Sequence, residues 1–185
     1  MDFLASVKKK KKLSKVVVVG SGAVGKTSFL KVLKSGKLLD ELELDFHRTL
    51  FMEFEALKID DNSFLMMDVA GQIDLPIHAL KDFERLALGR TDLVIMMFAA
   101  NSMQSFLDLE VWFSLVNKYF ENQREQPPTF IVIQNKLDLE RNVTEEMIDS
   151  VKLAVPKISR WFDLSLKTGL GLKEIFDYLG SFGGD

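Results

Sequence analysis

The chain has 185 residues, 47% of them hydrophobic, which is enough for one globular domain with a sizeable core. It contains no cysteine, which excludes disulfides and thiolate metal sites, and no apolar run is long enough to span a membrane. Residues 1–15 hold six lysines and one aspartate (+5), so at a net charge of −3 the remainder carries −8, which argues against nucleic-acid binding by the domain.

The first fourteen residues form a basic N-terminal tail. Lysines fill positions 8–12, and such a run of like charges favours a solvated, disordered chain. We therefore divide the chain into this tail, residues 1–14, and one folded domain, residues 15–185. The apolar residues 1–7 beside Lys8–Lys12 also suit weak contact with an anionic membrane or an acidic partner. Without a cysteine to carry a lipid, we expect a cytoplasmic protein with at most this peripheral contact.

A phosphate-binding loop follows the first predicted strand, Lys15–Val19. Gly20–Thr27 fits the pattern G-x-x-x-x-G-K-[ST], and a helix is expected from there to about Leu33, with Ser35-Gly36 as its stop. Between a strand and a helix, such a loop points backbone N–H groups at a phosphate. Lys26 can reach the outer phosphates, and the Thr27 hydroxyl can bind Mg²⁺.

The elements after this loop alternate between strand and helix patterns, which is typical of an α/β unit. The predicted strands cover residues 50–59, 63–69, 93–98, 129–133 and 161–164. The predicted helices cover residues 74–88, 103–120, 144–153 and 171–179. The turn residues Asp60-Asp61-Asn62 predict an antiparallel hairpin. We expect the helices to bury Phe106, Leu109, Phe113, Val116, Leu172, Ile175, Phe176 and Leu179.

Three polar motifs stand where predicted strands end. They are Asp68-Val69-Ala70-Gly71-Gln72, Asn135-Lys136-Leu137-Asp138 and Ser165-Leu166-Lys167. In an open α/β sheet, ligands bind at the carboxyl ends of the strands. Together with the phosphate loop, these motifs predict a nucleotide site at that edge.

From about Lys15 to Phe182 the chain resembles the Ras superfamily of small GTPases. The most specific part of the resemblance is Asn135–Asp138, and Phe98–Phe106 and Ser165–Gly171 also look Ras-like. The resemblance implies the α/β fold of small G proteins among the P-loop NTPases. That fold has three layers: a six-stranded, mostly parallel sheet with one antiparallel edge strand, and about five helices.

The resemblance also implies roles for the residues around the phosphates and the metal. GTP or GDP and Mg²⁺ are the implied ligands. The implied phosphate-binding residues are Gly20, Ser21, Gly22, Ala23, Val24, Gly25, Lys26, Thr27, Ser28 and Gly71. Mg²⁺ would be held by Thr27, Thr49 and Asp68, although Thr49 also reads as an ordinary β-forming residue at a strand start. Gln72 would orient the attacking water, and Lys26 would neutralise charge on the phosphates.

Guanine recognition is assigned to the last two motifs by the same resemblance. Asp138 would accept hydrogen bonds from N1–H and N2–H₂ of guanine, a donor pair that adenine lacks. Asn135 would contact the purine edge and tie the phosphate loop to this segment. The remaining implied contacts are the Lys136 stem across the base, Ser165 behind Asp138, the Leu166 N–H on the guanine oxygen, and Lys167.

The predicted function is a GTP/GDP molecular switch that hydrolyses GTP slowly. Effector, exchange and GTPase-activating proteins would bind through Lys37–Thr49 and Gly71–Leu88. A partner would supply the catalytic arginine, with Arg48 as an internal alternative. A second hypothesis is a nucleotide-locked interaction scaffold with negligible hydrolysis. A third, an ATPase or small-molecule kinase, is disfavoured because no arginine-rich lid is visible and Asp138 would misread adenine.

Overall fold

The fold is built on a six-stranded sheet. The computed structural model describes residues 13–42, 52–71, 83–123 and 126–183. The strands are β1 (Leu13–Val19), β2 (Met52–Ile59), β3 (Asn62–Val69), β4 (Leu93–Ala99), β5 (Thr129–Asn135) and β6 (Ile158–Asp163). Their spatial order is β2-β3-β1-β4-β5-β6. All neighbours are parallel except β2 and β3, so the predicted mostly parallel sheet with one antiparallel edge strand is confirmed.

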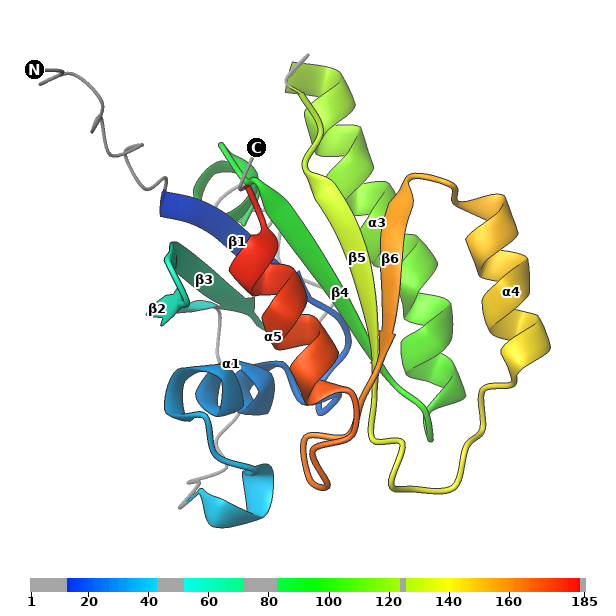
Figure 1. Cartoon of the computed structure of the whole chain (residues 1–185). Helices are drawn as coiled ribbons and strands as arrows, with labels where there is room; N and C mark the ends of the chain where they lie inside the picture. Colours follow the sequence, from blue (N-terminus) through cyan, green and yellow to red (C-terminus); the bar gives the residue numbers. More distant parts are fainter. Residues whose placement is uncertain (1–12, 43–51, 72–82, 124–125, 184–185) are drawn as a thin grey trace, which may run out of the picture.

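Helices cover both faces of this sheet (Figure 1). One face carries α1 (Lys26–Ser35) and α5 (Leu172–Ser181), and the other carries α3 (Met103–Gln123) and α4 (Glu145–Ala154). A short 3-10 helix, η1 (Leu39–Glu41), follows α1, and a π-helix, η2 (Phe83–Leu88), precedes β4. The three-layer arrangement agrees with the predicted fold class.

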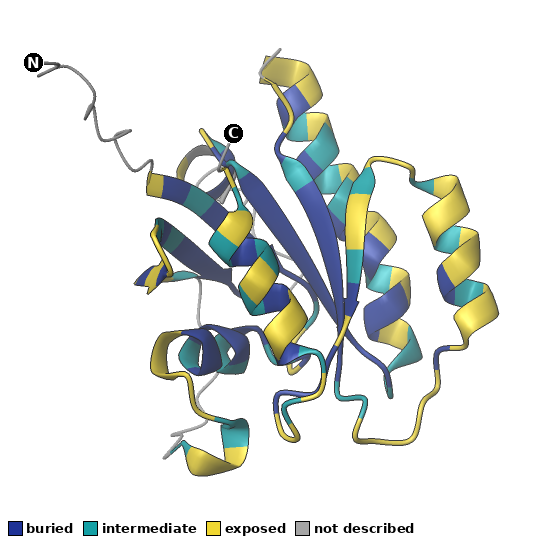
Figure 2. Ribbon diagram, viewed as in Figure 1, coloured by how far each residue is buried: buried dark blue, intermediate teal, exposed yellow. Residues whose placement is uncertain are grey.

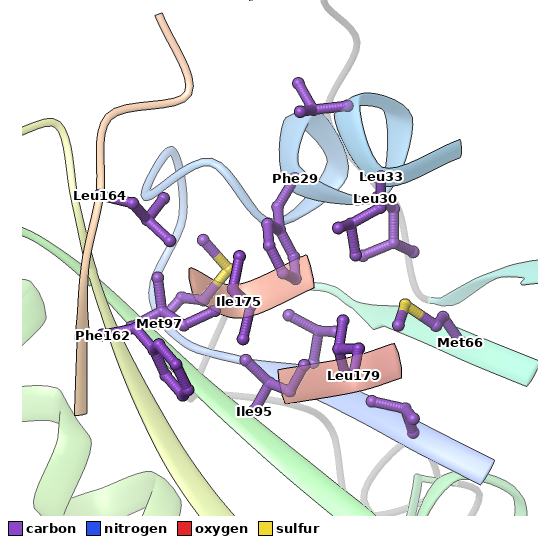
Figure 3. Packing of buried hydrophobic residues seen from close by; sticks show 14 of the residues in the cluster. Phe29, Leu30, Leu33, Met66, Ile95, Met97, Phe162, Leu164, Ile175 and Leu179 are labelled. Carbon is purple, nitrogen blue, oxygen red and sulfur yellow. The ribbon is translucent and has the colours of Figure 1, made fainter. Parts of the chain in front are cut away.

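The core lies in two layers separated by the sheet. Every residue of β4 is buried, as expected for a central parallel strand covered on both faces (Figure 2). Between the sheet and the helices α1 and α5, Phe29 of α1, Ile175 of α5 and Met97 of β4 pack together (Figure 3). Beneath α3, Trp112 and Phe98 fill the other layer. Each such side chain contributes about 1.5–3 kcal/mol by leaving water.

Local sequence signals set the ends of two helices. Gly36 adopts a left-handed conformation (φ 69°), and its N–H donates to the Val32 carbonyl at 2.9 Å, which ends α1 at the predicted stop. Thr144 caps α4, because its side-chain oxygen accepts a hydrogen bond from the Met147 N–H at 3.4 Å.

The structure corrects several predicted boundaries. Leu13 and Ser14, which we placed in the tail, pair with β3 as the first residues of β1. The strand predicted over residues 129–133 extends to Asn135, the last residue of β5, because pairing with β4 continues beyond its apolar run. Residues 74–82 of the predicted helix over 74–88 lie outside the described residues, and residues 83–88 form η2.

The buried face of α3 also differs in one position from the prediction. Trp112 is buried and Phe113 is half-buried at the edge of the core, with its ring 5.2 Å from that of Phe130. Both positions lie within one turn of Leu109 and Val116, so the sequence pattern alone does not choose between them. Within the described residues, no helix combines the length and apolar character needed to cross a bilayer.

A fully buried glutamine on β5 makes a testable exception to the apolar core. Gln134 is 0% exposed, and within the described residues neither of its amide atoms has a hydrogen-bond partner. Burying such a group costs about 1–3 kcal/mol. We therefore expect Gln134→Met, which keeps the shape, to raise the free energy of unfolding by about 1–2 kcal/mol in urea titrations. The same change at exposed Gln123 should have no effect. A loss of stability in Gln134→Met would show that the amide is satisfied.

Candidate functional site

A cleft of about 740 Å³ opens at the carboxyl edge of the sheet, where β1, β5 and β6 end. This edge lies at the bottom of the view in Figure 1. Segments far apart in the sequence meet there. The residues lining the cleft are Gly22, Ala23, Gly25, Lys26, Thr27, Ser28, Leu39, Gly71, Asn135, Lys136, Asp138, Leu139, Leu166 and Lys167.

The Lys26 ammonium lies in the curl of the phosphate loop. Its Nζ donates hydrogen bonds to the carbonyl oxygens of Gly20 and Ser21, both at 2.8 Å. Only 6% of the residue is exposed, and burial lowers the pKa of the ammonium to about 8, although the Asp68 carboxylate opposes that shift. The loop therefore holds a poorly solvated cation beside the cleft, where an anion would relieve its desolvation.

This pKa gives the nucleotide-free protein a distinctive pH dependence. Between pH 8 and about 10.5, Lys26 is deprotonated in the folded state and protonated in the unfolded state, so raising the pH favours folding. We expect the free energy of unfolding of the wild type to rise by up to about 3 kcal/mol relative to that of Lys26→Met across that window. Urea titrations of both proteins at pH 7–10 measure the gap. A constant gap would contradict the lowered pKa.

Asn135 connects the phosphate loop to the loop after β6. Its Nδ2 donates to the Val24 carbonyl at 2.9 Å, and its Oδ1 accepts from the Leu166 N–H at 3.3 Å. Gly25 makes room for this side chain, because a Cβ there would overlap Asn135 Nδ2 and its φ of 107° disfavours other residues. Asn135 thus fixes the phosphate loop, at one end of the cleft, relative to the loop after β6, at the other end.

The Asp138 carboxylate is held at the other end of the cleft. The Ser165 hydroxyl donates to its Oδ1 at 2.6 Å, and Ser165 itself is 0% exposed. The Thr168 N–H donates to the same hydroxyl at 3.2 Å and orients it. With Oδ1 engaged in this way, the carboxylate is restrained in one orientation and can still accept hydrogen bonds from a ligand.

Oxygen ligands for a hard cation gather beside the phosphate loop. The Thr27 hydroxyl donates a hydrogen bond to an oxygen of Asp68, a nearly fully buried carboxylate on β3. One hydroxyl and one carboxylate suit Mg²⁺, which keeps several waters and takes further ligands from phosphates. Within the described residues there is no cluster of three or more acidic or histidine side chains that would form an all-protein metal site.

The structure thus brings most of the predicted site residues to one cleft. Five of them lie behind its lining and support it: Gly20, Ser21, Val24, Asp68 and Ser165. Thr49 and Gln72, together with Arg48 and the tail Lys8–Lys12, lie outside the described residues.

Two apolar residues of the cleft were not predicted. Leu39 and Leu139 line it beside Lys136 and Asp138. Leu39 is held there because its N–H donates to the Leu166 carbonyl at 3.0 Å. The place of Leu139 in the cleft could have been predicted, because Leu139 directly follows the Asn135–Asp138 motif. Leu39 lies in a polar connector and carries no such signal.

Comparison with known proteins finds matches within one protein family. The model of the Ras family matches residues 15–181. The chain is 25% identical over 181 residues to the GTP-binding protein RHO2 of Saccharomyces cerevisiae, covering 88% of this chain and 85% of that protein. It is 24% identical over 178 residues to the Ras-related protein Rab-7B of Dictyostelium discoideum, covering 94% and 84%. Over 142 residues it is 28% identical to human Ras-related protein Rab-9A, covering 74% and 66%.

Proposed function

Because this chain belongs to the Ras family, whose members are small GTPases that bind guanine nucleotides, we propose that it is a GTP/GDP molecular switch. In this proposal it binds GTP together with Mg²⁺ and hydrolyses it slowly to GDP and phosphate. GTP orders the regions around Thr49 and Gly71, and hydrolysis releases them.

The observation that carries the proposal is the restrained Asp138 carboxylate in the same cleft as Lys26. A carboxylate that accepts two hydrogen bonds selects guanine, since adenine cannot donate from both positions. A buried cation at the opposite end suits phosphates. Asn135 fixes the spacing between the two ends. Leu39 and Leu139 supply the apolar surface that a purine ring requires.

At the phosphate end, we assign Mg²⁺ to Thr27 and Asp68, with Thr49 as a further ligand. When bound, Mg²⁺ neutralises charge on the β- and γ-phosphates. Lys26 adds a second positive charge to the same phosphates, and Gln72 orients the attacking water. A catalytic arginine comes from an activating protein, with Arg48 as the internal alternative. Effectors and regulators bind over Lys37–Thr49 and Gly71–Leu88.

Extraction of the nucleotide from purified protein, followed by chromatography, tests the proposal. A switch should release GDP or GTP at close to one equivalent per chain. Unlabelled GTP, and not ATP, should displace bound labelled GDP. Single-turnover hydrolysis then separates the switch from the nucleotide-locked scaffold, which would leave GTP intact. A protein that carries ATP, or no nucleotide and no affinity for one, would overturn the proposal.

We further propose a cytoplasmic location with weak membrane contact through the basic tail. Each lysine near an anionic surface contributes about 1 kcal/mol at most, which is sufficient only for salt-sensitive association. We expect the full chain to co-sediment with phosphatidylserine vesicles at low salt and to dissociate at moderate salt. A chain without residues 1–12 should not co-sediment; the deletion ends there because β1 begins at Leu13. Equal sedimentation of both chains would exclude a membrane role for the tail.

A further inference from the structure

A chain of hydrogen bonds joins the phosphate loop to α3. The Ser21 hydroxyl donates to Oδ2 of Asp108, and Gln104 Nε2 donates to Oδ1 of the same carboxylate at 2.8 Å. Gln104 and Asp108 lie one helical turn apart on α3, so the amide holds the carboxylate in place. The contact spans 87 residues of sequence between Ser21 and Asp108.

These hydrogen bonds hold the Ser21–Gly22 peptide of the phosphate loop, and that peptide has two other contacts. The Ser21 carbonyl accepts one of the two hydrogen bonds from the Lys26 ammonium. Gly71 packs so closely against the peptide that a Cβ on Gly71 would overlap the Ser21 carbonyl and the Gly22 nitrogen. The Lys26 ammonium and Gly71, the residue before Gln72, therefore both contact this one peptide.

We propose that Asp108 is a positioning residue for the phosphate loop, acting through the Ser21 hydroxyl. The inference rests on the proposed function, since the loop is useful only if it binds phosphate. A hydrogen bond to a charged acceptor is stronger than a neutral one, so Asp108 restrains Ser21 more firmly than solvent would. Losing that restraint frees the Ser21–Gly22 peptide to rotate, and the Lys26 ammonium loses the fixed geometry that holds the phosphates. Asp108 lies outside the lining of the cleft and acts only through Ser21.

The dissociation rate of a fluorescent GDP analogue, measured on the full chain well below the melting temperature, tests this role. We expect Asp108→Ala and Ser21→Ala each to raise the rate by about two- to tenfold. The double variant should be no faster than either single variant, because both changes remove the same bond. Ser21→Thr, which keeps a hydroxyl, should restore slow release. Glu110→Ala removes an exposed carboxylate from the same helix and should leave the rate unchanged.

The outcomes separate this inference from the proposed function. Wild-type protein that holds no GDP would overturn both. Wild-type protein that holds GDP, with unchanged release from Ser21→Ala and Asp108→Ala, would overturn the positioning role alone. Additive effects in the double variant would also overturn it, since they would show that the two residues act separately. If Asp108→Ala does not fold, Ser21→Ala and Ser21→Thr decide the question, because they alter only a half-buried side chain of the loop.

Discussion

Asp138→Asn is expected to lower the affinity for GDP and GTP by at least about 100-fold. The carboxylate offers acceptors to both N1–H and N2–H₂ of guanine, whereas an amide presents one acceptor and one donor. That donor would face the N2–H₂ donor of the base and leave it unpaired. The Ser165 hydroxyl can still donate to the remaining amide oxygen, so the fold around the site should survive. Titration with fluorescent GDP at fixed Mg²⁺ measures the change.

Two comparisons make the result specific to base recognition. Asp149→Asn removes an exposed carboxylate on α4 and should leave the affinity unchanged. A nucleotide with an oxygen in place of N2–H₂, such as xanthosine diphosphate, should bind Asp138→Asn better than GDP does, because the new amide can donate to that oxygen. Wild-type GDP affinity in Asp138→Asn would show that another group reads the base.

Gln72→Leu is expected to reduce the single-turnover rate of GTP hydrolysis by about tenfold or more. Leucine keeps much of the bulk of glutamine but cannot hydrogen bond to the attacking water. GTP affinity should stay close to that of the wild type, because the interaction is needed in the transition state and not for binding. Rapid-quench measurement of phosphate release from preloaded protein gives the rate.

The matched control for this change is Gln123→Leu at the exposed end of α3, which should hydrolyse GTP at the wild-type rate. Equal rates for Gln72→Leu and the wild type would move catalysis to another residue, of which Arg48 is the first to test. Absence of hydrolysis in the wild type itself would favour the nucleotide-locked scaffold.

The sequence alone determined the fold class and the edge of the sheet where the site lies. Both follow from short-range patterns: the buried strand and glycine loop around Lys26, the hairpin turn before Asn62, and the polar motifs that follow apolar runs. Each of these patterns is a few residues long. It acts through the backbone conformation of those residues, or through the burial of one face of the strand or helix that they form. For that reason the helix stop at Gly36 could be predicted to the residue.

Only the tertiary structure decided the partners that no short motif names. The family resemblance implied that Asn135 ties the phosphate loop to its own segment, but its partner, the Val24 carbonyl 111 residues away, and the bond from Ser21 to Asp108 across 87 residues came from the structure. Leu39 reaches the cleft from a connector without a sequence pattern, held by the Leu166 carbonyl. Such contacts depend on the order of the strands and on how the helices pack over them. A residue's own neighbours in sequence do not encode its partner when that partner is set by the packing of distant elements.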